Sequence, residues 1–372
     1  MTIGILLDSR FLGGAEKRAL AIAAALNDRE VPCSLLVNEE TKKQLGAGFA
    51  RFPSLPVSVY RDLGWRGWLG VGLRQFGMAR HIPWLDRIEC EIGRAWWRSE
   101  KQFRDITLLH VFLRPQVLRF FRGPQVFEVT SPDVAKRILA VPELIPRRTV
   151  LHCVSESVAA RLGTAFPFNR KVVAPIPFFQ TRSDEHRPCR SKENLIVFGH
   201  RWIPRKNPIL FARAAKRFVA ARPDWRVLIR GQGPLESELR SVLKNELASG
   251  TIELGYNADL REELERSRIF VSLIEQDNYP SQSLVEAMWC RNAVVLSDRG
   301  STRARLFANN GVVCKIDEEQ VFNGLMRLAG DEDWIEECGE NSRRHVAENF
   351  DASLYLDHLL DVYALARKLV AS

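Results

Sequence analysis

Short apolar runs alternate with amphipathic stretches along this chain, and the alternation breaks once. The first series has apolar runs at 3–7, 33–37, 108–112, 125–129, 149–154 and 171–174. The second series has them at 195–198, 225–229, 251–254, 269–273 and 293–296. Strands that alternate with helices are typical of a parallel sheet covered by helices. The pattern therefore predicts an α/β protein with two such sheets.

The break lies at Pro175-Ile176-Pro177, and a polar stretch without periodicity follows it at 180–192. Two domains also fit the length of 372 residues, because a single core seldom serves more than about 250 residues. We expect doubly wound domains at 1–178 and 179–350 with an interdomain cleft, since such sheets bind ligands at the carboxyl ends of their strands. The amphipathic stretch at 351–372 predicts a long helix that packs back on the first domain.

The composition is typical of a globular chain. Hydrophobic residues make up 46% and charged residues 27%, and no apolar run approaches the roughly 20 residues of a transmembrane helix. Residues 1–8 lack a basic start and a cleavable apolar stretch, so we expect a cytoplasmic protein. The seven cysteines are scattered without a Cys-x-x-Cys pair, which is typical of reduced, buried thiols.

The net charge of +9 lies entirely in the first half of the chain. Residues 1–185 hold 27 Lys and Arg against 18 Asp and Glu, whereas the remaining residues hold 27 of each. Such an asymmetry indicates an anionic partner on one face: nucleic acid, a phosphorylated substrate or an acidic membrane surface.

Cations gather in the loop that follows the first strand of the second series. Arg201, Arg205 and Lys206 lie there, at the strand end where a diphosphate would sit. Arginine offers phosphate a fork of donors and lysine offers a point charge. The alternative is a solvated basic loop.

Two glycine-rich turns also follow strands, at Gly13-Gly14-Ala15-Glu16 and at Gly231-Gln232-Gly233-Pro234. Glycine lets backbone approach a phosphate closely at a helix start. Each motif also fits a plain strand-to-helix turn, so both interpretations stay open.

The segment 277–288 follows a strand and leads into a helix. The amino end of that helix would attract an anion, and Glu286 could accept hydrogen bonds from sugar hydroxyls. The alternative is a capping box, in which Ser283 caps the helix and Glu286 reaches back to a backbone N–H.

In this order, these segments resemble retaining nucleotide-sugar glycosyltransferases of family 4 (glycosyltransferase group 1). Further matching segments are Val154-Ser155-Glu156-Ser157, Leu254-Gly255-Tyr256, Val294-Val295-Leu296-Ser297-Asp298 and Asn310-Gly311-Val312-Val313. The resemblance covers nearly the whole chain and is patchy at 40–125. It implies the GT-B architecture, with a Rossmann-like acceptor-binding domain followed by a Rossmann-like domain that binds the nucleotide-sugar.

The resemblance also implies a donor site in the second domain. Arg201 and Lys206 match the family's basic pair on the donor diphosphate, and Glu286 matches the carboxylate that holds the ribose. Tyr256 lies where members place the nucleotide base. The backbone N–H groups of Ser283 and Leu284 would face the phosphates. The other residues implied for donor binding are Gly13, Gly14, Gly199, Gly231, Gly233 and Ser281.

The family usually has a second glutamate eight positions before the one that Glu286 matches, and here Asn278 stands in its place. We therefore expect Asp277 or Asn278 to contact the donor sugar. Retaining enzymes of this kind let the leaving diphosphate help to deprotonate the acceptor, so the protein mainly positions groups and stabilises charge. The expected catalytic residues are Arg201, Lys206, Asp277 and Asn278.

No metal or cofactor is expected on this account. Asp331-Glu332-Asp333 matches an Asp-x-Asp pattern, but it lies in an acidic helical run that follows no strand. We interpret this run as a solvated face. The nucleotide-sugar is a substrate, with UDP-sugar or GDP-sugar as the expected donor.

On the acceptor side we expect Thr130, Ser131 and His110. Many family members have a histidine after the strand equivalent to 125–129, near the transferred sugar, and Thr130 and Ser131 stand there in this chain.

Residues 61–122 resemble the family least and hold 12 Lys and Arg against 6 Asp and Glu. They also contain five of the nine tryptophans: Trp65, Trp68, Trp84, Trp96 and Trp97. Cations interleaved with aromatic rings suit the surface of an anionic membrane. The alternative places the tryptophans in the core. The same pattern can bind nucleic acid, but no recognised nucleic-acid module is present.

The sequence therefore predicts a glycosyltransferase of the hexosyltransferase type (EC 2.4) that acts with retention on a saccharide or lipid-linked acceptor. We expect a role in cell-surface polysaccharide, lipopolysaccharide or glycolipid synthesis, and a peripheral position on the inner face of the cytoplasmic membrane. The alternatives are a catalytically silent GT-B scaffold that binds a partner, or a nucleotide-sugar epimerase.

Overall fold

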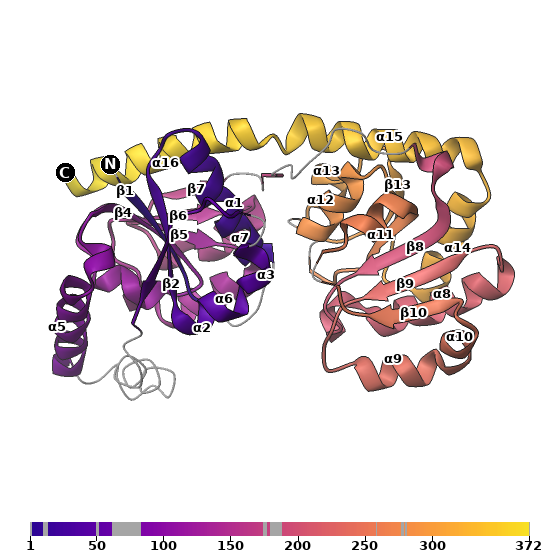
Figure 1. The fold of residues 1–372 in the computed structure, drawn as a ribbon, viewed down its shortest axis with the longest axis horizontal. Coiled ribbons are helices and arrows are strands. Elements are labelled where there is room, and N and C mark those ends of the chain that lie inside the picture. The colour runs from indigo at the N-terminus through magenta and orange to yellow at the C-terminus, as the bar shows by residue number, and fades with distance from the viewer. Residues whose placement is uncertain are drawn as a thin grey trace. The chain divides into compact units, whose positions relative to one another are not determined.

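A computed structural model describes residues 2–9, 14–49, 52–61, 83–173, 177–178, 188–257, 259–276, 279 and 281–371. The chain forms two compact units, each with its own sheet flanked by helices (Figure 1). The first unit contains Met1–Pro177 and Ala352–Ser372, and the second contains Phe178–Asp351.

The first unit has a seven-stranded sheet in the order β3-β2-β1-β4-β5-β6-β7, in which all neighbouring strands are parallel. Its strands are β1 (Thr2–Leu7), β2 (Cys33–Asn38), β3 (Val57–Tyr60), β4 (Ile106–Phe112), β5 (Gln125–Val129), β6 (Thr149–Cys153) and β7 (Lys171–Val173). The order 3-2-1-4-5-6 is that of a Rossmann-like domain. The predicted fold class is confirmed for this unit.

The helices of the first unit connect these strands. They are α1 (Gly14–Asp28), α2 (Glu39–Gln44), α3 (Gly46–Phe49), α5 (Pro83–Ser99), α6 (Pro132–Ala140) and α7 (Glu156–Leu162), with short 3-10 turns η2 (Lys101–Phe103), η3 (Pro115–Arg119), η4 (Pro142–Leu144) and η5 (Gly163–Ala165). The last helix, α16 (Ala352–Ala371), packs against β5, β6 and α1. The predicted return of the C-terminal helix to the first domain is therefore confirmed.

The second unit has a six-stranded parallel sheet in the order β10-β9-β8-β11-β12-β13. Its strands are β8 (Glu193–Gly199), β9 (Arg226–Arg230), β10 (Ile252–Gly255), β11 (Ser267–Ser272), β12 (Ala293–Ser297) and β13 (Gly311–Cys314). Its helices are α8 (Pro208–Ala221), α9 (Glu236–Val242), α10 (Lys244–Ser249), α11 (Arg261–Arg266), α12 (Gln282–Trp289), α13 (Thr302–Arg305), α14 (Glu318–Ala329) and α15 (Glu332–Asn349), with 3-10 turns η6 (Cys189–Ser191) and η7 (Pro204–Lys206). This unit also has the predicted Rossmann-like arrangement.

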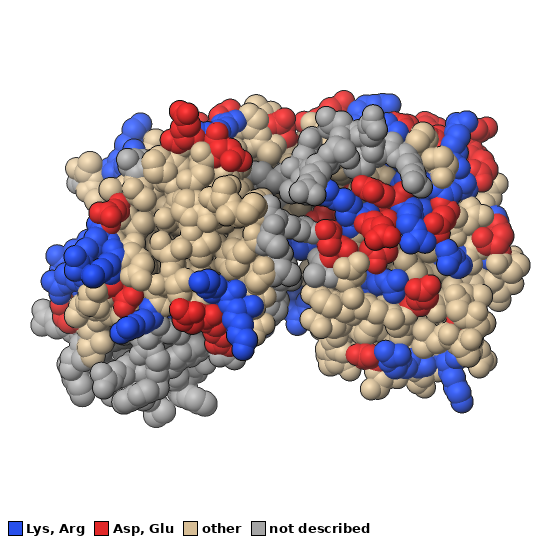
Figure 2. All heavy atoms as spheres, in the orientation of Figure 1, with Lys and Arg blue, Asp and Glu red and all other residues tan. Residues whose placement is uncertain are grey.

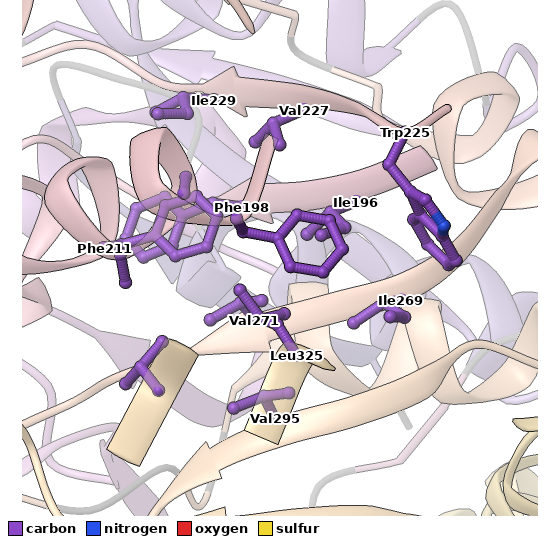
Figure 3. Packing of buried hydrophobic residues seen from close by; sticks show 14 of the residues in the cluster. Ile196, Phe198, Phe211, Trp225, Val227, Ile229, Ile269, Val271, Val295 and Leu325 are labelled. Atoms are coloured by element: carbon purple, nitrogen blue, oxygen red, sulfur yellow. The ribbon is translucent and has the colours of Figure 1, made fainter. Parts of the chain in front are cut away.

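One buried cluster of the second unit lies between its sheet and the helices α8 and α14 (Figure 3), and another includes residues of α12 and α15. Phe198 of β8 stacks on Phe211 of α8, with 4.9 Å between the ring centroids. Val271 of β11 and Leu325 of α14 are fully buried in the same cluster. Because such strands are covered on both faces, they are apolar along their whole length, which is why the sequence shows them as short continuous runs.

None of the helices within the described ranges is long and apolar enough to cross a bilayer. Six of the seven cysteines are buried, and burial raises the pKa of the Cys33 thiol to about 12. A buried, protonated thiol is chemically inert.

Candidate functional site

The predicted basic loop follows β8 at the carboxyl end of the second sheet. Its backbone pairs with the loop after the neighbouring strand β9: Trp202 N donates to Gln232 O (3.0 Å) and Leu235 N donates to Trp202 O (3.2 Å). In this loop the Arg201 side chain is exposed and that of Lys206 is half-buried. Both cations therefore stand at a strand end where a ligand has access to them.

The glycines of the Gly231-Gln232-Gly233-Pro234 turn allow this close pairing. A Cβ atom on Gly231 would lie 2.0 Å from the carbonyl oxygen of His200, and one on Gly233 would lie 2.4 Å from that of Trp202. A Cβ on Gly199 would lie 2.5 Å from the Leu260 side chain. The glycines are thus needed for packing of the loops, and this packing holds the basic loop in place.

His200 is a site residue that sequence reasoning missed. Its side chain is 8% exposed and lies between the rings of Phe198 and Phe270. Burial, together with the charge of Lys206, holds the pKa of His200 well below its ordinary value. The imidazole is therefore neutral, and its Nε2 has no hydrogen-bond partner among the described residues. The sequence feature that could have identified His200 is its position at a strand end, directly before Arg201.

The amino end of α12 lies at the end of β11, the strand next to β8. The first intrahelical bond runs from Val285 N to Ser281 O (3.1 Å), so the N–H groups of the first turn lie at the open end of the helix. Ser281 is the N-cap and is 7% exposed. Ser283 and Glu286 lie inside the helix, so the alternative of a capping box between them is wrong.

Two hydrogen bonds join the basic loop to the segment after β11. The Asn207 Nδ2 group donates to Leu273 O (2.9 Å), and Glu275 N donates to Arg205 O (3.0 Å). The predicted residues Asp277 and Asn278 of this segment lie outside the described residues. Arg201, Lys206 and the helix that carries Glu286 thus occupy adjacent strand ends on one edge of the sheet.

Tyr256 extends this edge. It follows β10 directly and is 56% exposed, so its ring is accessible to a ligand. The Gly231 N–H donates to Gly255 O (2.8 Å), which links the ends of β9 and β10.

In the first unit, Thr130 and Ser131 follow β5 and are half-buried. The Ser131 hydroxyl accepts a hydrogen bond from Val134 N (3.3 Å) and so caps α6. Gly14 begins α1 and is exposed, whereas the predicted residue Gly13 lies outside the described residues.

The prediction that His110 lies on the acceptor side is corrected by its burial. His110 is 0% exposed, with Nε2 3.0 Å from Glu128 Oε2 and Nδ1 2.9 Å from the Tyr363 hydroxyl of α16. Both ring nitrogens are engaged in the interior. His110 therefore fixes α16 to the sheet and does not face a substrate.

Glu128 is the centre of this buried group. Besides His110, it contacts His152 Nδ1 (2.7 Å) and forms an ion pair with Arg18 of α1. Burial alone would raise the pKa of Glu128, but Arg18 and the two histidines outweigh burial and hold it well below its ordinary value. His110, Glu128 and His152 could each offer a metal one ligand atom. Because Arg18 neutralises the carboxylate, we assign the group to holding α1 and α16 on the sheet.

The two tryptophans of 61–122 whose side chains the structure describes pack in or against the apolar core of the first unit. Trp97 is 8% exposed and stacks on Phe103, with 4.1 Å between the ring centroids. The Trp96 Nε1–H donates to Arg61 O (2.8 Å). The core alternative is therefore right for Trp97, whereas Trp96 is half-buried and packs against the same apolar cluster. Trp65, Trp68 and the side chain of Trp84 lie outside the described residues.

The acidic run 331–333 begins α15 and is exposed, as predicted. The Asp331 carboxylate accepts a hydrogen bond from Trp334 N (2.9 Å), and Glu332 pairs with Arg268 (2.7 Å). These contacts are those of a capped helix start at the surface.

Residues 180–345 match the family described as glycosyl transferases group 1. The chain is similar to three solved structures. Anabaena HepE in complex with UDP and glucose has 14% identity and a TM-score of 0.68, over 97% of this chain and 99% of that one. A mutant of S. aureus TarM in complex with Fondaparinux, alpha-GlcNAc-glycerol and UDP has 10% identity and a TM-score of 0.72, over 97% of this chain and 99% of that one. Sucrose-phosphate synthase from Thermosynechococcus elongatus has 14% identity and a TM-score of 0.71, over 100% of both chains. At these identities, the likeness to the solved structures shows the fold. No curated protein sequence matches the chain.

Proposed function

We propose that this chain, a GT-B glycosyltransferase whose residues 180–345 match the group 1 family, transfers a sugar from a UDP- or GDP-sugar with retention of configuration. The observation that carries the proposal is the pair of strand ends in the second unit. The loop with Arg201 and Lys206 follows β8, and the amino end of α12 follows β11. The hydrogen bonds of Asn207 and Glu275 join that loop to the segment between β11 and α12.

Each donor group meets a matching protein group in this proposal. Arg201 and Lys206 bind the diphosphate, and the N–H groups at the start of α12 add donors for the same anion. Glu286, half-buried one turn further along, accepts hydrogen bonds from the ribose hydroxyls. The nucleotide base lies on Tyr256. UDP in the complexes of HepE and TarM supports a uridine donor.

Catalysis in this proposal depends on charge stabilisation. As the bond to the sugar breaks, negative charge develops on the leaving diphosphate, and Arg201 and Lys206 stabilise it. The diphosphate takes the proton of the acceptor hydroxyl as the acceptor oxygen bonds to the anomeric carbon. Because the acceptor attacks from the face that the diphosphate leaves, the configuration is retained. Asp277 or Asn278 holds the donor sugar. No metal or cofactor takes part.

The acceptor in this proposal is a saccharide or a lipid-linked saccharide that meets Thr130 and Ser131 in the synthesis of a polysaccharide, lipopolysaccharide or glycolipid. The basic character of 61–122 supports a position at the inner face of the cytoplasmic membrane. Flotation with anionic vesicles tests this contact: we expect binding at low salt that the double variant Arg66→Ala, Trp68→Ala weakens. Binding that is absent, or equal in the variant, contradicts it.

Thermal denaturation with a panel of nucleotides tests the donor site. A nucleotide at about 100 times its Kd stabilises the folded unit by about 2.7 kcal/mol, which raises the Tm by about 5–11 °C for a unit of this size. We expect this shift with UDP or GDP, and its loss in Lys206→Ala. The matched control is Lys244→Ala, which removes an exposed lysine of α10. No shift with any nucleotide, or the same shift in Lys206→Ala, rules the donor site out.

A further inference from the structure

Arginine precedes each of four neighbouring strands in the first sheet. Arg104 comes before β4, Arg122 before β5, Arg148 before β6 and Arg170 before β7. These strands are parallel and adjacent in the order β4-β5-β6-β7. The four arginines therefore share the amino edge of the sheet, opposite to the carboxyl edge that carries Thr130. Lys and Arg side chains gather beside α5, at the left of the first unit in Figure 2.

Two other arginines act electrostatically on Arg148: Arg122 of the same edge and Arg94 of α5. Burial lowers the pKa of the Arg148 guanidinium, and the charges of Arg94 and Arg122 lower it further. Glu91 is the acid that pairs with Arg94, at 2.5 Å. The Nε–H groups of Arg94 and Arg148 are buried and have no acceptor among the described residues. Within the described part of the chain, two buried N–H donors thus lack an acceptor beside three positive charges.

Tight packing fixes the arginines. Gly93 of α5 lies so close to the Phe120 ring that a Cβ atom would be 2.2 Å from it. The Arg148 Nη2 group donates to the carbonyl oxygen of Phe121 (2.8 Å). Arg94 and Arg148 are therefore brought together by a packed helix and a fixed turn, and the packing of the unit offsets their repulsion.

We propose that Arg94, Arg122 and Arg148 form a binding site for the phosphate of an anionic lipid headgroup. Guanidinium groups bind phosphate oxygens through paired N–H donors, which these arginines supply. Exposed apolar side chains of the same unit favour a bilayer over a soluble phosphate. Phe168 is 63% exposed beside the Arg147 guanidinium (4.3 Å), and Ile92 of α5 is 45% exposed.

This site deepens the membrane contact in the proposed function, but it does not depend on donor binding. Arg148 lies outside the segment 61–122, and all three arginines belong to the first unit. The thermal shift with nucleotide therefore stays the same in variants of this site. Failure of one proposal can thus be told from failure of the other.

The experiment compares flotation of the full chain with vesicles of phosphatidylcholine alone or mixed with phosphatidylglycerol. We expect binding to the anionic vesicles only. The variant Arg122→Gln, Arg148→Gln should bind about 30-fold more weakly, because each arginine near such a surface contributes about fivefold. The matched control is Arg213→Gln, Lys244→Gln, which removes two exposed charges of the second unit and should change binding less than about twofold.

Two further measurements keep the test decisive. Arg122→Gln alone changes an exposed side chain, so its expected loss of about fivefold does not depend on the folding of the double variant. Thermal denaturation with inorganic phosphate provides the second arm. Stabilisation by phosphate without vesicle binding overturns the lipid assignment. Vesicle binding that falls equally in the control and the arginine variant overturns the site.

Discussion

The change Glu128→Gln tests the buried charge network that holds the first unit together. Glu128 is 0% exposed and pairs with Arg18, which is 5% exposed, and with His110 and His152. The substitution keeps the shape of the side chain and removes its charge. Removing one partner of a buried ion pair costs about 3–5 kcal/mol, because the other charge stays buried without compensation.

For a unit of this size, we expect the Tm of the first unit to fall by about 6–20 °C. Calorimetry of the full chain measures this, and the transition of the second unit should not move. The control is Asp28→Asn, an exposed charge at the end of α1, which should change stability by less than about 0.5 kcal/mol.

The double variant Arg18→Met, Glu128→Leu removes both charges. It should be more stable than Glu128→Gln, because no buried charge is then left alone. A Tm loss in Glu128→Gln as small as that of the control, or a double variant less stable than Glu128→Gln, refutes the reasoning.

Two more predictions concern the glycine turn of the second unit and the buried histidines of both units. In Gly233→Ala, the new Cβ would lie 2.4 Å from Trp202 O. We therefore expect the free energy of unfolding in urea to fall by about 1–3 kcal/mol and UDP to bind more weakly. The control is Gly46→Ala, where nothing lies within 4 Å of the new Cβ, and equal effects in both variants contradict the loop packing. Burial lowers the pKa of His110 and that of His200. Both stay neutral in the folded chain, whereas in the unfolded chain they take up protons below about pH 6.5. As the pH is lowered below that value, the free energy of unfolding should therefore decrease by up to about 1.4 kcal/mol per pH unit for each histidine. His200→Asn should reduce this slope, and an unchanged slope argues against a neutral His200.

The sequence predicted the central strands of both sheets well, because they are buried on both faces and give continuous apolar runs. The edge strands β3 and β13 were missed. Val57–Tyr60 and Gly311–Cys314 are short and partly exposed, so their apolar pattern is weak.

The position of Arg201 and Lys206 after a strand was predictable, and both lie in the loop after β8. Their role in donor binding stays a prediction. The assignment of His110 failed because a position within a strand does not reveal what packs over it, and Tyr363 of α16 lies 253 residues away. Glu128 shows the same limit. A charge inside an apolar strand indicates a buried ion pair, but its partner Arg18 is 110 residues distant.

The most direct test of the central claim is turnover of nucleotide-sugars without acceptor, followed by proton NMR of the released sugar. We expect hydrolysis of a UDP- or GDP-sugar with the anomer retained in the first product. Lys206→Ala should slow this reaction about 10²–10³-fold, and Lys244→Ala should not. Nucleotide binding without turnover of any donor, an inverted first product, or full activity in Lys206→Ala contradicts the account.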